Sequence, residues 1–360
     1  MKMRVNLESV CQRGTSNLRQ SDIIDKTGDY PVYGAAGYIS SVNFYHQDKP
    51  YVAVVKDGAG IGRTMLLPPK SSVIGTMQYL LPNDNILPKY LYYAVKHMHL
   101  EKYYTGAAIP HIYFKDYKNE EFNYESIDNQ RKIIAIFDEI EKIIAFRQKQ
   151  LQQLDELVKA RFVEMFGDPI LNPYNWDVVT IGDIVTDVRY GTSKPAVEGG
   201  KYPYLRMNNL TYDGHLDLAN LKYIDIPDSE IEKCIVRKGD ILFNRTNSIE
   251  LVGKTCVYDL EDNMVIAGYI IRVRLCDKVL PIVLSSYMNS TVLKDQLRSM
   301  AKGAVNQANI NAQELQSIKI YLPPINLQKQ FATFVKQIDK SKFCVTNYLR
   351  KIQLIKGELL

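Results

Sequence analysis

Apolar residues recur at alternating spacings of four and three positions in two stretches of the chain. The first stretch begins near Asp128 and contains no proline or glycine before Gly167, and the second begins near Asn326. This spacing is an a/d heptad pattern, which predicts two long helices over residues 128–167 and 326–360. The apolar seam consists of Ile133, Phe137, Ile140, Ile144, Leu151, Leu154 and Val158 in the first helix, and of Phe331, Val335, Ile338, Val345, Leu349 and Ile352 in the second.

The narrow seam of each long helix requires a partner. A stripe of two positions in seven is too narrow to cover a core, so pairing the two helices buries both seams at once. Each helix follows its own globular segment, and a pseudo-twofold arrangement pairs the helices as an antiparallel coiled coil. The alternative is that each helix folds back on the segment that precedes it. Arg147 interrupts the first seam, and Lys342 and Lys356 fall on the second, whose coil we expect to be less regular.

The two globular segments show short apolar runs between turn residues. In the first segment these runs predict strands over 51–55, 63–67 and 77–81, followed by a helix over 88–103. The second segment has the same order, with strands over 240–243, 254–258 and 270–274 and a helix over 281–300. Strand runs that do not alternate regularly with helices favour the α+β class over a doubly wound sheet.

Self-comparison indicates a duplication. Residues 128–142 align with 326–340 at an offset of 198, and residues 105–109 resemble 302–306 at an offset of 197. Tyr30 and Pro31 match Tyr202 and Pro203 at an offset of only 172, which predicts an insertion in the front half of the second copy. We therefore divide the chain into a globular domain, a long helix, a second globular domain and a second long helix, with the bounds 1–127, 128–167, 168–325 and 326–360.

Charge and cysteine usage narrow the class of protein. The formal net charge of the 360 residues is +5, and residues 326–360 alone carry seven basic against two acidic residues. This basic helix either follows phosphates or pairs with an acidic neighbour as a solvated face. The five cysteines are scattered without a CxxC pair, which favours reduced thiols over a disulfide framework or a metal site. Neither a signal peptide nor a transmembrane stretch is visible, so we expect a cytoplasmic protein.

Motifs of enzymatic chemistry are weak in this chain. The glycines at 58–62 follow a strand but precede another strand, which favours a hairpin over a phosphate-binding loop. Asn172, Pro173, Tyr174 and Asn175 resemble the tetrapeptide with which amino-methyltransferases hold a flipped base, but the second proline is replaced, so we interpret them as a linker turn. The sequence contains no HExxH or GxSxG pattern. We therefore expect a non-enzymatic protein without catalytic residues.

Polar, basic and aromatic residues gather in several predicted loops. Arginine and lysine side chains can bridge guanine O6 and N7, and asparagine or glutamine can pair with adenine N6 and N7. The alternative is that these are ordinary surface loops. The candidate DNA-contacting residues are Lys56, Arg63, Lys102, Tyr104 and His111 in the first copy, and Arg189, Tyr190, Lys194, Arg206, Asn208, Asn209, Arg245, Asn247, Lys302, Asn306 and Gln307 in the second.

The whole chain resembles the specificity subunit of a type I restriction–modification system. The resemblance rests on the duplicated order of domain and long helix and on three phrases: Tyr-Pro-Tyr-Leu-Arg-Met-Asn-Asn-Leu at 202–210, Arg-Lys-Gly-Asp-Ile-Leu at 237–242, and Tyr-Leu-Pro-Pro-Ile-Asn-Leu-Gln-Lys-Gln at 321–330. The Phe-Gly-Asp-Pro at 166–169 is similar to the family's join between halves. The first copy departs from the family at 119–124, where Asn-Glu-Glu-Phe-Asn-Tyr replaces the Leu-Pro-Pro phrase.

This resemblance implies an architecture and a set of partners. Each globular domain would be a target-recognition domain that reads one half of a bipartite sequence in double-stranded DNA, and the paired helices would set the spacer between the halves. Two modification subunits would carry S-adenosylmethionine and the methylating site, and restriction/translocase subunits would join through them. This chain itself would hold no cofactor.

Two other functions stay open from the residues alone. A cytoplasmic coiled-coil scaffold would bind other proteins through both globular domains and would leave adenine methylation unchanged. A self-sufficient methyltransferase is disfavoured by the altered tetrapeptide, and binding of S-adenosylmethionine by the isolated chain would revive it.

Overall fold

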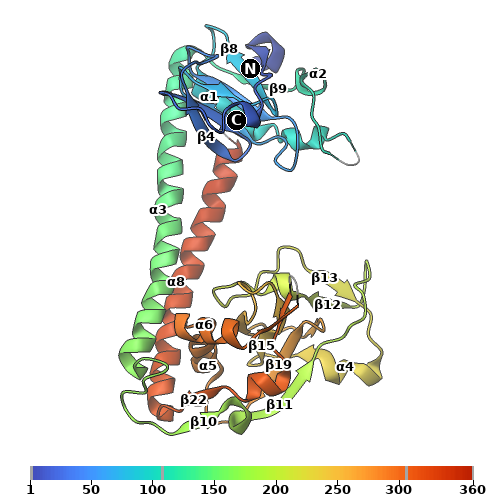
Figure 1. Ribbon diagram of the computed structural model, residues 1–360, viewed down its shortest axis with the longest axis vertical. Coiled ribbons are helices and arrows are strands. Elements are labelled where there is room, and N and C mark those ends of the chain that lie inside the picture. The colour runs from blue at the N-terminus through green and yellow to red at the C-terminus, as the bar shows by residue number, and fades with distance from the viewer. Residues whose placement is uncertain (1–2, 107–108, 305–306, 359–360) are drawn as a thin grey trace. The chain divides into compact units, whose positions relative to one another are not determined.

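The computed structural model describes residues 3–106, 109–304 and 307–358, with the backbone alone for 302–304, 353 and 355–358. The internal contacts divide the chain into two compact units. Unit 1 consists of Met1–Lys149 and Val345–Leu360, and unit 2 consists of Gln150–Cys344. Each unit combines one globular part with segments of the two long helices, α3 (Ile127–Phe166) and α8 (Ile325–Glu358) (Figure 1).

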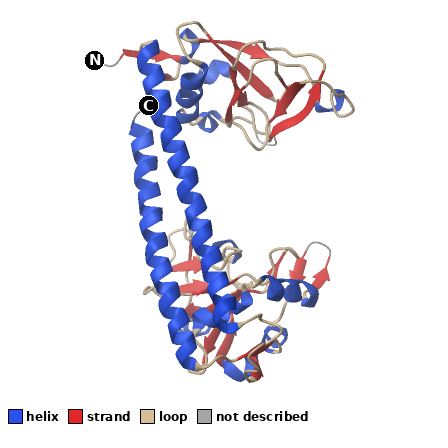
Figure 2. Ribbon diagram, turned by 90° about the vertical axis from the view of Figure 1, so that its left-hand side faces the viewer, coloured by secondary structure: helices blue, strands red, loops and turns tan. Residues whose placement is uncertain are grey.

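The globular part of unit 1 is built on a four-stranded antiparallel sheet in the order β2-β8-β5-β6. Its strand β5 (Tyr51–Val55) is buried throughout, because alternate side chains enter two different cores. Val52 and Val54 pack with α1 (Pro88–His97), whereas Tyr51 and Ala53 pack with the small sheet β4-β3-β7. Helices and strands are distinguished by colour in Figure 2. The other elements of unit 1 are β1 (Met3–Asn6), β2 (Cys11–Thr15), β3 (Tyr30–Gly34), β4 (Gly37–Val42), β6 (Thr64–Leu67), β7 (Ser72–Val73), β8 (Met77–Pro82), α2 (Phe114–Tyr117) and β9 (Glu121–Tyr124).

The globular part of unit 2 repeats this design. Its main sheet has the order β11-β19-β15-β17, and a second sheet has the order β13-β12-β18-β14. Helix α4 and strand β14 have no counterpart among the described elements of unit 1, in agreement with the insertion predicted in the second copy. The elements are β10 (Val178–Thr180), β11 (Val185–Tyr190), β12 (Tyr202–Leu205), β13 (Lys222–Ile224), α4 (Asp228–Cys234), β14 (Ile235–Val236), β15 (Ile241–Asn244), β16 (Thr246–Asn247), β17 (Thr255–Val257), β18 (Met264–Ile266), β19 (Ile270–Leu275), α5 (Pro281–Met288), α6 (Thr291–Met300), β20 (Lys302–Ala304), β21 (Gln307–Asn309), α7 (Ala312–Gln316) and β22 (Lys319–Tyr321).

A buried glutamine marks the start of each long helix. In unit 1, Gln130 is fully buried, its Oε1 accepts from the Leu87 amide over 2.8 Å, and its Nε2 donates to the carbonyls of Asn85 and Glu125. Burial of an amide is tolerated when all its polar atoms are satisfied. The bond to Leu87 ties the helix to the residue that precedes α1.

The same arrangement recurs 198 residues later. Gln328 is fully buried, accepts from the Leu280 amide over 2.9 Å, and donates to the carbonyls of Lys278 and Pro323. Both long helices also follow a strand paired antiparallel with the first strand of their copy, β9 with β1 and β22 with β10. The replacement at 119–124 therefore leaves the entry into the first helix unchanged, and the predicted duplication is confirmed.

The structure corrects two helix predictions. The helix expected over 88–103 ends at His97, because His99 adopts a left-handed backbone with φ of 52° before a short 3-10 turn at Leu100–Tyr103. The helix expected over 281–300 is two helices, α5 and α6, because Ser290 is extended and its hydroxyl accepts from the Leu293 amide as the N-cap of α6. The glycines at 58–62 connect β5 and β6 in an antiparallel hairpin, as predicted.

The apolar seam of the long helices is buried or half-buried at every predicted position. Within unit 2, the contacts Phe162–Phe331 and Asp155–Lys342 show that α3 and α8 run antiparallel there, since the residue number falls along one helix as it rises along the other. Phe162 and Phe166 continue the seam beyond Val158, which is the last seam residue predicted from the sequence. In the described part of the chain, no helix has the combination of length and hydropathy that crossing a membrane requires.

The charged seam residues have aromatic or ionic partners. Within unit 1, the Arg147 guanidinium lies 5.2 Å from the centre of the Tyr348 ring. Within unit 2, the Lys342 ammonium forms an ion pair with Asp155. The cost of placing a charge on an apolar seam is therefore offset locally. The side chain of Lys356 lies outside the described residues.

Candidate nucleic-acid interface

Two loops of unit 1 meet at the end of β5. The Gly58 amide donates to the Pro110 carbonyl over 2.9 Å, and this contact joins the 56–63 loop to the loop that ends at His111. Asp57 lies between the two predicted residues Lys56 and His111, forming an ion pair with the first and accepting a 2.7 Å bond at Oδ1 from His111 Nδ1. The structure therefore brings Lys56 and His111 together through a carboxylate that sequence reasoning missed.

Aromatic stacking extends this cluster. The rings of His111 and Tyr113 are stacked with centroids 6.3 Å apart, and the Lys115 ammonium lies 5.4 Å from the Tyr113 ring. Burial opposes ionisation of Asp57, but the hydrogen bonds from Lys56 and His111 outweigh it and lower the pKa of the carboxyl group. Asp57 is therefore a carboxylate at neutral pH and acts only as an acceptor.

The other three predicted residues of unit 1 do not join this cluster through direct contacts. Arg63 donates from Nη1 to the Ala35 carbonyl over 2.7 Å. Lys102 forms an ion pair with Glu120, and Tyr104 is exposed with 52% of its surface in solvent.

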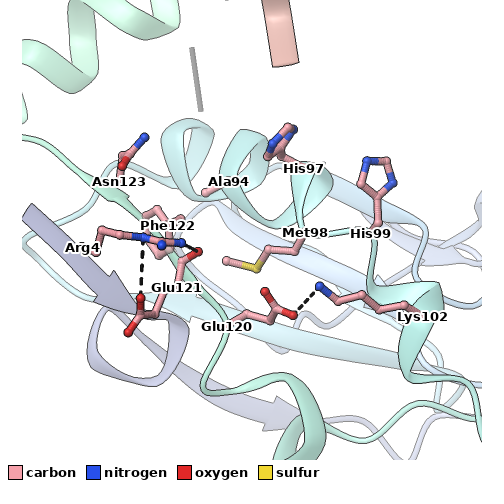
Figure 3. Close-up of a pocket in the computed structure, with 10 residues that line it drawn as sticks. All are labelled: Arg4, Ala94, His97, Met98, His99, Lys102, Glu120, Glu121, Phe122 and Asn123. Atoms are coloured by element: carbon pink, nitrogen blue, oxygen red, sulfur yellow. Dashed lines mark hydrogen bonds and ion pairs between the residues drawn. The ribbon is translucent and has the colours of Figure 1, made fainter. Parts of the chain in front are cut away.

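Lys102 also lines a cavity of about 480 Å³ between the end of α1 and the strands β1 and β9 (Figure 3). Its polar lining is largely self-paired, because Arg4 contacts Glu121 and Lys102 contacts Glu120. Such a lining leaves little free charge for a ligand. We assign no cofactor to this cavity.

Two predicted residues of unit 2 form a stacked pair. The Arg245 guanidinium lies 4.9 Å from the centre of the Tyr190 ring, and the Tyr190 hydroxyl accepts from the Ala312 amide over 2.9 Å. The tyrosine is thereby held in place at its hydroxyl end, and its ring supports the cation. Residues 190 and 245, which come from β11 and the turn after β15, are thus combined in one polar surface.

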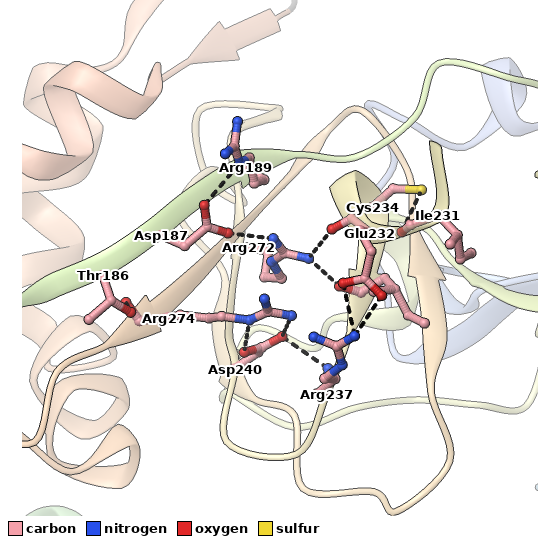
Figure 4. A network of polar contacts seen from close by, with 11 residues as sticks. Thr186, Asp187, Arg189, Ile231, Glu232, Cys234, Arg237, Asp240, Arg272 and Arg274 are labelled. Atoms are coloured by element: carbon pink, nitrogen blue, oxygen red, sulfur yellow. Dashed lines mark hydrogen bonds and ion pairs between the residues drawn. The ribbon is translucent and has the colours of Figure 1, made fainter. Parts of the chain in front are cut away.

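A buried arginine organises the neighbouring strand (Figure 4). Arg272 is only 1% exposed and donates to the Asp187 carboxylate and to the carbonyls of Glu232 and Ile235. Asp187 also accepts a 2.9 Å bond from Nε of the predicted residue Arg189. Burial opposes ionisation of Asp187, but Arg272 and Arg189 lower the pKa of its carboxyl group. Because Arg272 holds Asp187 and Asp187 accepts from Arg189, the network orients the exposed Arg189 side chain.

A second group of contacts in this network links β19 to the turn before β15. Arg274 Nε donates to Asp240 over 3.0 Å, and Asp240 in turn accepts from the Arg237 amide. The Arg237 guanidinium contacts Glu232 on α4 over 2.7 Å (Figure 4). The inserted helix α4 is thus tied to the main sheet by charged groups.

The remaining predicted residues of unit 2 differ in exposure. Asn208 and Gln307 are exposed, and Lys194 pairs with Glu230 over 2.9 Å. Arg206 donates to the Asn220 carbonyl over 3.2 Å.

Two predicted asparagines have structural partners. Asn209 is 2% exposed, and its side-chain amide accepts from the Arg206 backbone amide and donates to the Asp217 backbone carbonyl. It therefore stabilises a turn instead of facing solvent. Asn247 donates to Asn244 Oδ1 over 2.8 Å. The side chain of Lys302 and the whole of Asn306 lie outside the described residues.

One cluster has the composition of a metal site. The ligand atoms of Asp155, Asp213 and His215 lie within 4.8 Å of one another in unit 2. The Lys342 ammonium already forms an ion pair with Asp155, and His215 Nε2 lies 3.5 Å from the same carboxylate. An internal cation therefore balances the carboxylate, and the geometry is that of an ion-pair cluster between α3, α8 and the 211–215 turn.

The stability of unit 2 is expected to depend on pH through this cluster. The hydrogen bond to Asp155 raises the pKa of His215 above 6.5. The stability that protonated His215 contributes is therefore fully present below pH 6.5 and is lost as the pH rises through the raised pKa. Burial opposes ionisation of Asp155, but His215 and Lys342 lower the pKa of its carboxyl group to about 2. The stability that ionised Asp155 contributes is therefore present above pH 3.8 and is lost as the pH falls toward 2. The cluster therefore stabilises most between about pH 4 and pH 6.5.

Urea unfolding of the full chain at pH 5, 6, 7 and 8 measures this dependence. Asp155→Asn is expected to flatten the loss of stability between pH 6 and pH 8 relative to the unsubstituted protein. The matched control is Glu101→Gln, which removes the carboxylate from the exposed His99–Glu101 pair of unit 1 and is expected to leave the pH profile unchanged. An unaltered profile in Asp155→Asn would show that the His215 pair contributes nothing.

Comparison with known proteins places both halves of the chain in one class. A family model described as type I restriction modification DNA specificity domain matches residues 2–156 and 173–355. The MjaX putative type I restriction enzyme specificity subunit of Methanocaldococcus jannaschii is 33% identical over 172 residues, which are 46% of this chain and 40% of that protein. The EcoKI specificity subunit of Escherichia coli K12 is 26% identical over 185 residues, 49% of this chain and 40% of that protein. The chain thus matches about two fifths of the length of these two relatives.

Longer matches come from a third relative and from solved structures. The MjaVIII specificity subunit of M. jannaschii is 23% identical over 314 residues, which cover 80% of this chain and 72% of that protein. The type I restriction–modification S subunit of M. genitalium has a TM-score of 0.51 at 17% identity and covers all of this chain and 95% of its own. A chain from a study of complex assembly and conformational transition of the type I R-M system has a TM-score of 0.57 at 16% identity, covering 99% and 96%. These two structures share the fold of this chain.

Proposed function

Because the chain belongs to the type I restriction–modification DNA specificity domain family, we propose that it is the non-catalytic DNA-recognition subunit of a type I restriction–modification complex. The observation that carries this proposal is the double match of the family model, once to each copy of the structural repeat. In this proposal each globular part reads one half of a bipartite sequence in double-stranded DNA. The polar clusters around Lys56–His111 and Tyr190–Arg245 are the candidate reading surfaces.

The long helices are proposed to set the gap between the two half-sequences as an antiparallel coiled coil. Helix α3 has 40 residues, which corresponds to about 60 Å at 1.5 Å per residue. One turn of B-DNA is about 34 Å, so a strut of this length suits half-sites separated by one to two helical turns. The antiparallel contacts of α3 and α8 within unit 2 support this assignment.

The chemistry is assigned to partner subunits. We propose that two modification subunits bind S-adenosylmethionine and methylate adenine, and that restriction/translocase subunits join the complex through them. A cytoplasmic location follows from this role. The family assignment supports these partners, and a scaffold without DNA specificity has no comparable support.

Exchange of the first globular part tests the proposal. A chimera in which residues 1–127 are replaced by the corresponding segment of another specificity subunit is expected to change one half of the methylated motif and to keep the other half and the gap. Methylome sequencing of cells that express the chimera with the modification partner gives the readout. The unaltered chain in the same cells is the control, and it should produce a split motif with a fixed gap.

Two results of this experiment would contradict the proposal. Adenine methylation that does not depend on the chain would favour the scaffold. A chimera that changes both halves, or neither, would show that the two globular parts do not read DNA independently.

A further inference from the structure

The turn after β5 in unit 1 is held by backbone hydrogen bonds. The Gly62 amide donates to the Val55 carbonyl over 2.9 Å, and the Ile112 amide donates to the Lys56 carbonyl over 2.9 Å. Gly62 has a φ of +80°, a conformation that favours glycine. We call these two bonds the backbone frame of the turn. Neither bond involves a side chain of Lys56 or of its neighbours, so the frame tolerates different side chains.

Unit 2 has the same frame after β15. The Gly253 amide donates to the Asn244 carbonyl over 3.0 Å, and the Ile310 amide donates to the Arg245 carbonyl over 2.9 Å. Gly253 has a φ of +78°. The equivalence identifies Lys56 with Arg245 and Ile112 with Ile310, although their offsets in sequence differ.

A polar pair occupies the same place on each frame. In unit 1, the residue after Lys56 and the residue before Ile112 are Asp57 and His111, joined by the 2.7 Å bond between Oδ1 and Nδ1. In unit 2, the residues at the same two positions are Thr246 and Asn309, and the Thr246 hydroxyl donates to Asn309 Oδ1 over 2.8 Å. The backbone is conserved between the copies, whereas the chemistry of the pair is changed.

The two pairs present opposite hydrogen-bonding character. The Asp57 carboxylate accepts from His111 Nδ1–H, which selects the tautomer of the neutral form in which Nε2 is an acceptor. The Thr246 bond uses Asn309 Oδ1, so the amide nitrogen on the other branch is left as a donor. In the major groove, adenine and cytosine each offer an amino donor, and adenine also offers the acceptor N7, whereas guanine and thymine offer acceptors without a donor.

The neighbouring residues suit a DNA surface. The cations Lys56 and Arg245 flank the pairs at equivalent positions, and the Tyr113 and Tyr190 rings stack beside them. A cation next to an oriented polar group allows phosphate attraction and base contact from one loop.

We propose that Asp57–His111 and Thr246–Asn309 are equivalent specificity-determining pairs, the first directed at an amino-bearing base and the second at a base that offers an acceptor. This inference rests on the proposed function, which it deepens by naming the positions that distinguish the two half-sequences. The second pair is the more informative, because neither Thr246 nor Asn309 is among the DNA-contacting residues predicted from the sequence.

Exchange of the pairs tests this inference. The double variant Asp57→Thr/His111→Asn gives unit 1 the pair of unit 2, and Thr246→Asp/Asn309→His gives the reverse. After the wild-type motif is known from methylome sequencing, competition binding is measured for the complex with its modification partner on duplexes that differ by single base pairs. Each double variant is expected to change discrimination by at least tenfold at one base pair of one half, toward guanine or thymine for the first variant and toward adenine or cytosine for the second. The other half is expected to be unchanged.

The matched control is His99→Asn in unit 1. His99 also pairs with a carboxylate, Glu101, over 3.2 Å, and its left-handed backbone suits asparagine. This control is expected to leave discrimination unchanged at every position. Circular dichroism of each variant checks that the fold is kept. We expect it to be kept, because the frame consists of backbone hydrogen bonds that the exchanged side chains do not make.

The outcomes separate this inference from the proposed function. A wild-type complex that shows no split motif overturns the proposed function itself. A split motif that both exchanged variants read with unaltered discrimination overturns the inference alone. Unfolding of the variants, or a uniform loss of binding across all duplexes, also overturns it, because the pairs would then serve folding or affinity.

Discussion

Phe331→Ala is expected to destabilise unit 2 by about 3–5 kcal/mol, the usual cost of deleting a buried phenylalanine side chain. Phe331 is fully buried, and its ring centre lies 5.6 Å from that of Phe162 and 5.3 Å from that of Phe166. The substitution leaves a cavity where α8 meets α3 and the core of unit 2. Urea unfolding of the full chain, followed by far-UV circular dichroism, measures the loss.

The same helix provides the control for this substitution. Phe343 is 67% exposed, so Phe343→Ala is expected to change the free energy of unfolding by no more than about 0.5 kcal/mol. A similar effect of the two substitutions would show that the aromatic contact of α3 and α8 does not stabilise unit 2. A selective effect of Phe331→Ala would show that the helix pairing is part of the folded core.

Lengthening both long helices by one heptad is expected to widen the gap of the recognised DNA motif by about three base pairs. Seven residues add about 10 Å at 1.5 Å per residue, and the heptad keeps the apolar seam on the same face. We place the insertions after Gln150 in α3 and after Cys344 in α8, so that each lies between the residues of the Asp155–Lys342 and Arg147–Tyr348 contacts in its helix. Methylome sequencing reads the gap directly.

The contrasting variant carries the insertion in α3 alone. It changes the register of one seam only, so we expect methylation of the original motif to fall at least tenfold without a new, wider motif. A gap that is unchanged in the double insertion would refute the helices as the spacer, whereas the domain-exchange experiment would still test whether each globular part reads DNA.

The helices and the duplication were predictable because their signals are local and periodic. The heptad spacing located α3 and α8 to within one or two residues at their described ends, and the offset of 198 anticipated the matching roles of Gln130 and Gln328. The helix breaks at His99 and Ser290 were missed, since the apolar pattern continues through both. A left-handed residue and an N-cap serine interrupt a helix without changing its hydropathy.

The candidate site was predicted only in part. A search for basic and amide side chains found Lys56, His111 and Arg245, which lie on the two equivalent frames. Asp57 and Thr246 were not predicted, because a carboxylate or a hydroxyl gives no signal of DNA contact by itself, and Asn309 was not predicted although its amide is of the type considered. Asp57 and Thr246 orient their partners through single hydrogen bonds.

The two long helices, the order of globular segments and helices, the twofold repetition and the family were predictable from the sequence, because these depend on residue type and spacing along the chain. Tertiary structure decided which side chains are neighbours. Asn209 and Arg189 resemble each other as polar loop residues, yet one is buried in a turn and the other is exposed above the Arg272 network. The partners of Asn209 are nearby in sequence, whereas the carboxylate that holds Arg189 is itself held by Arg272, 85 residues away, and no local pattern encodes a partner at that distance.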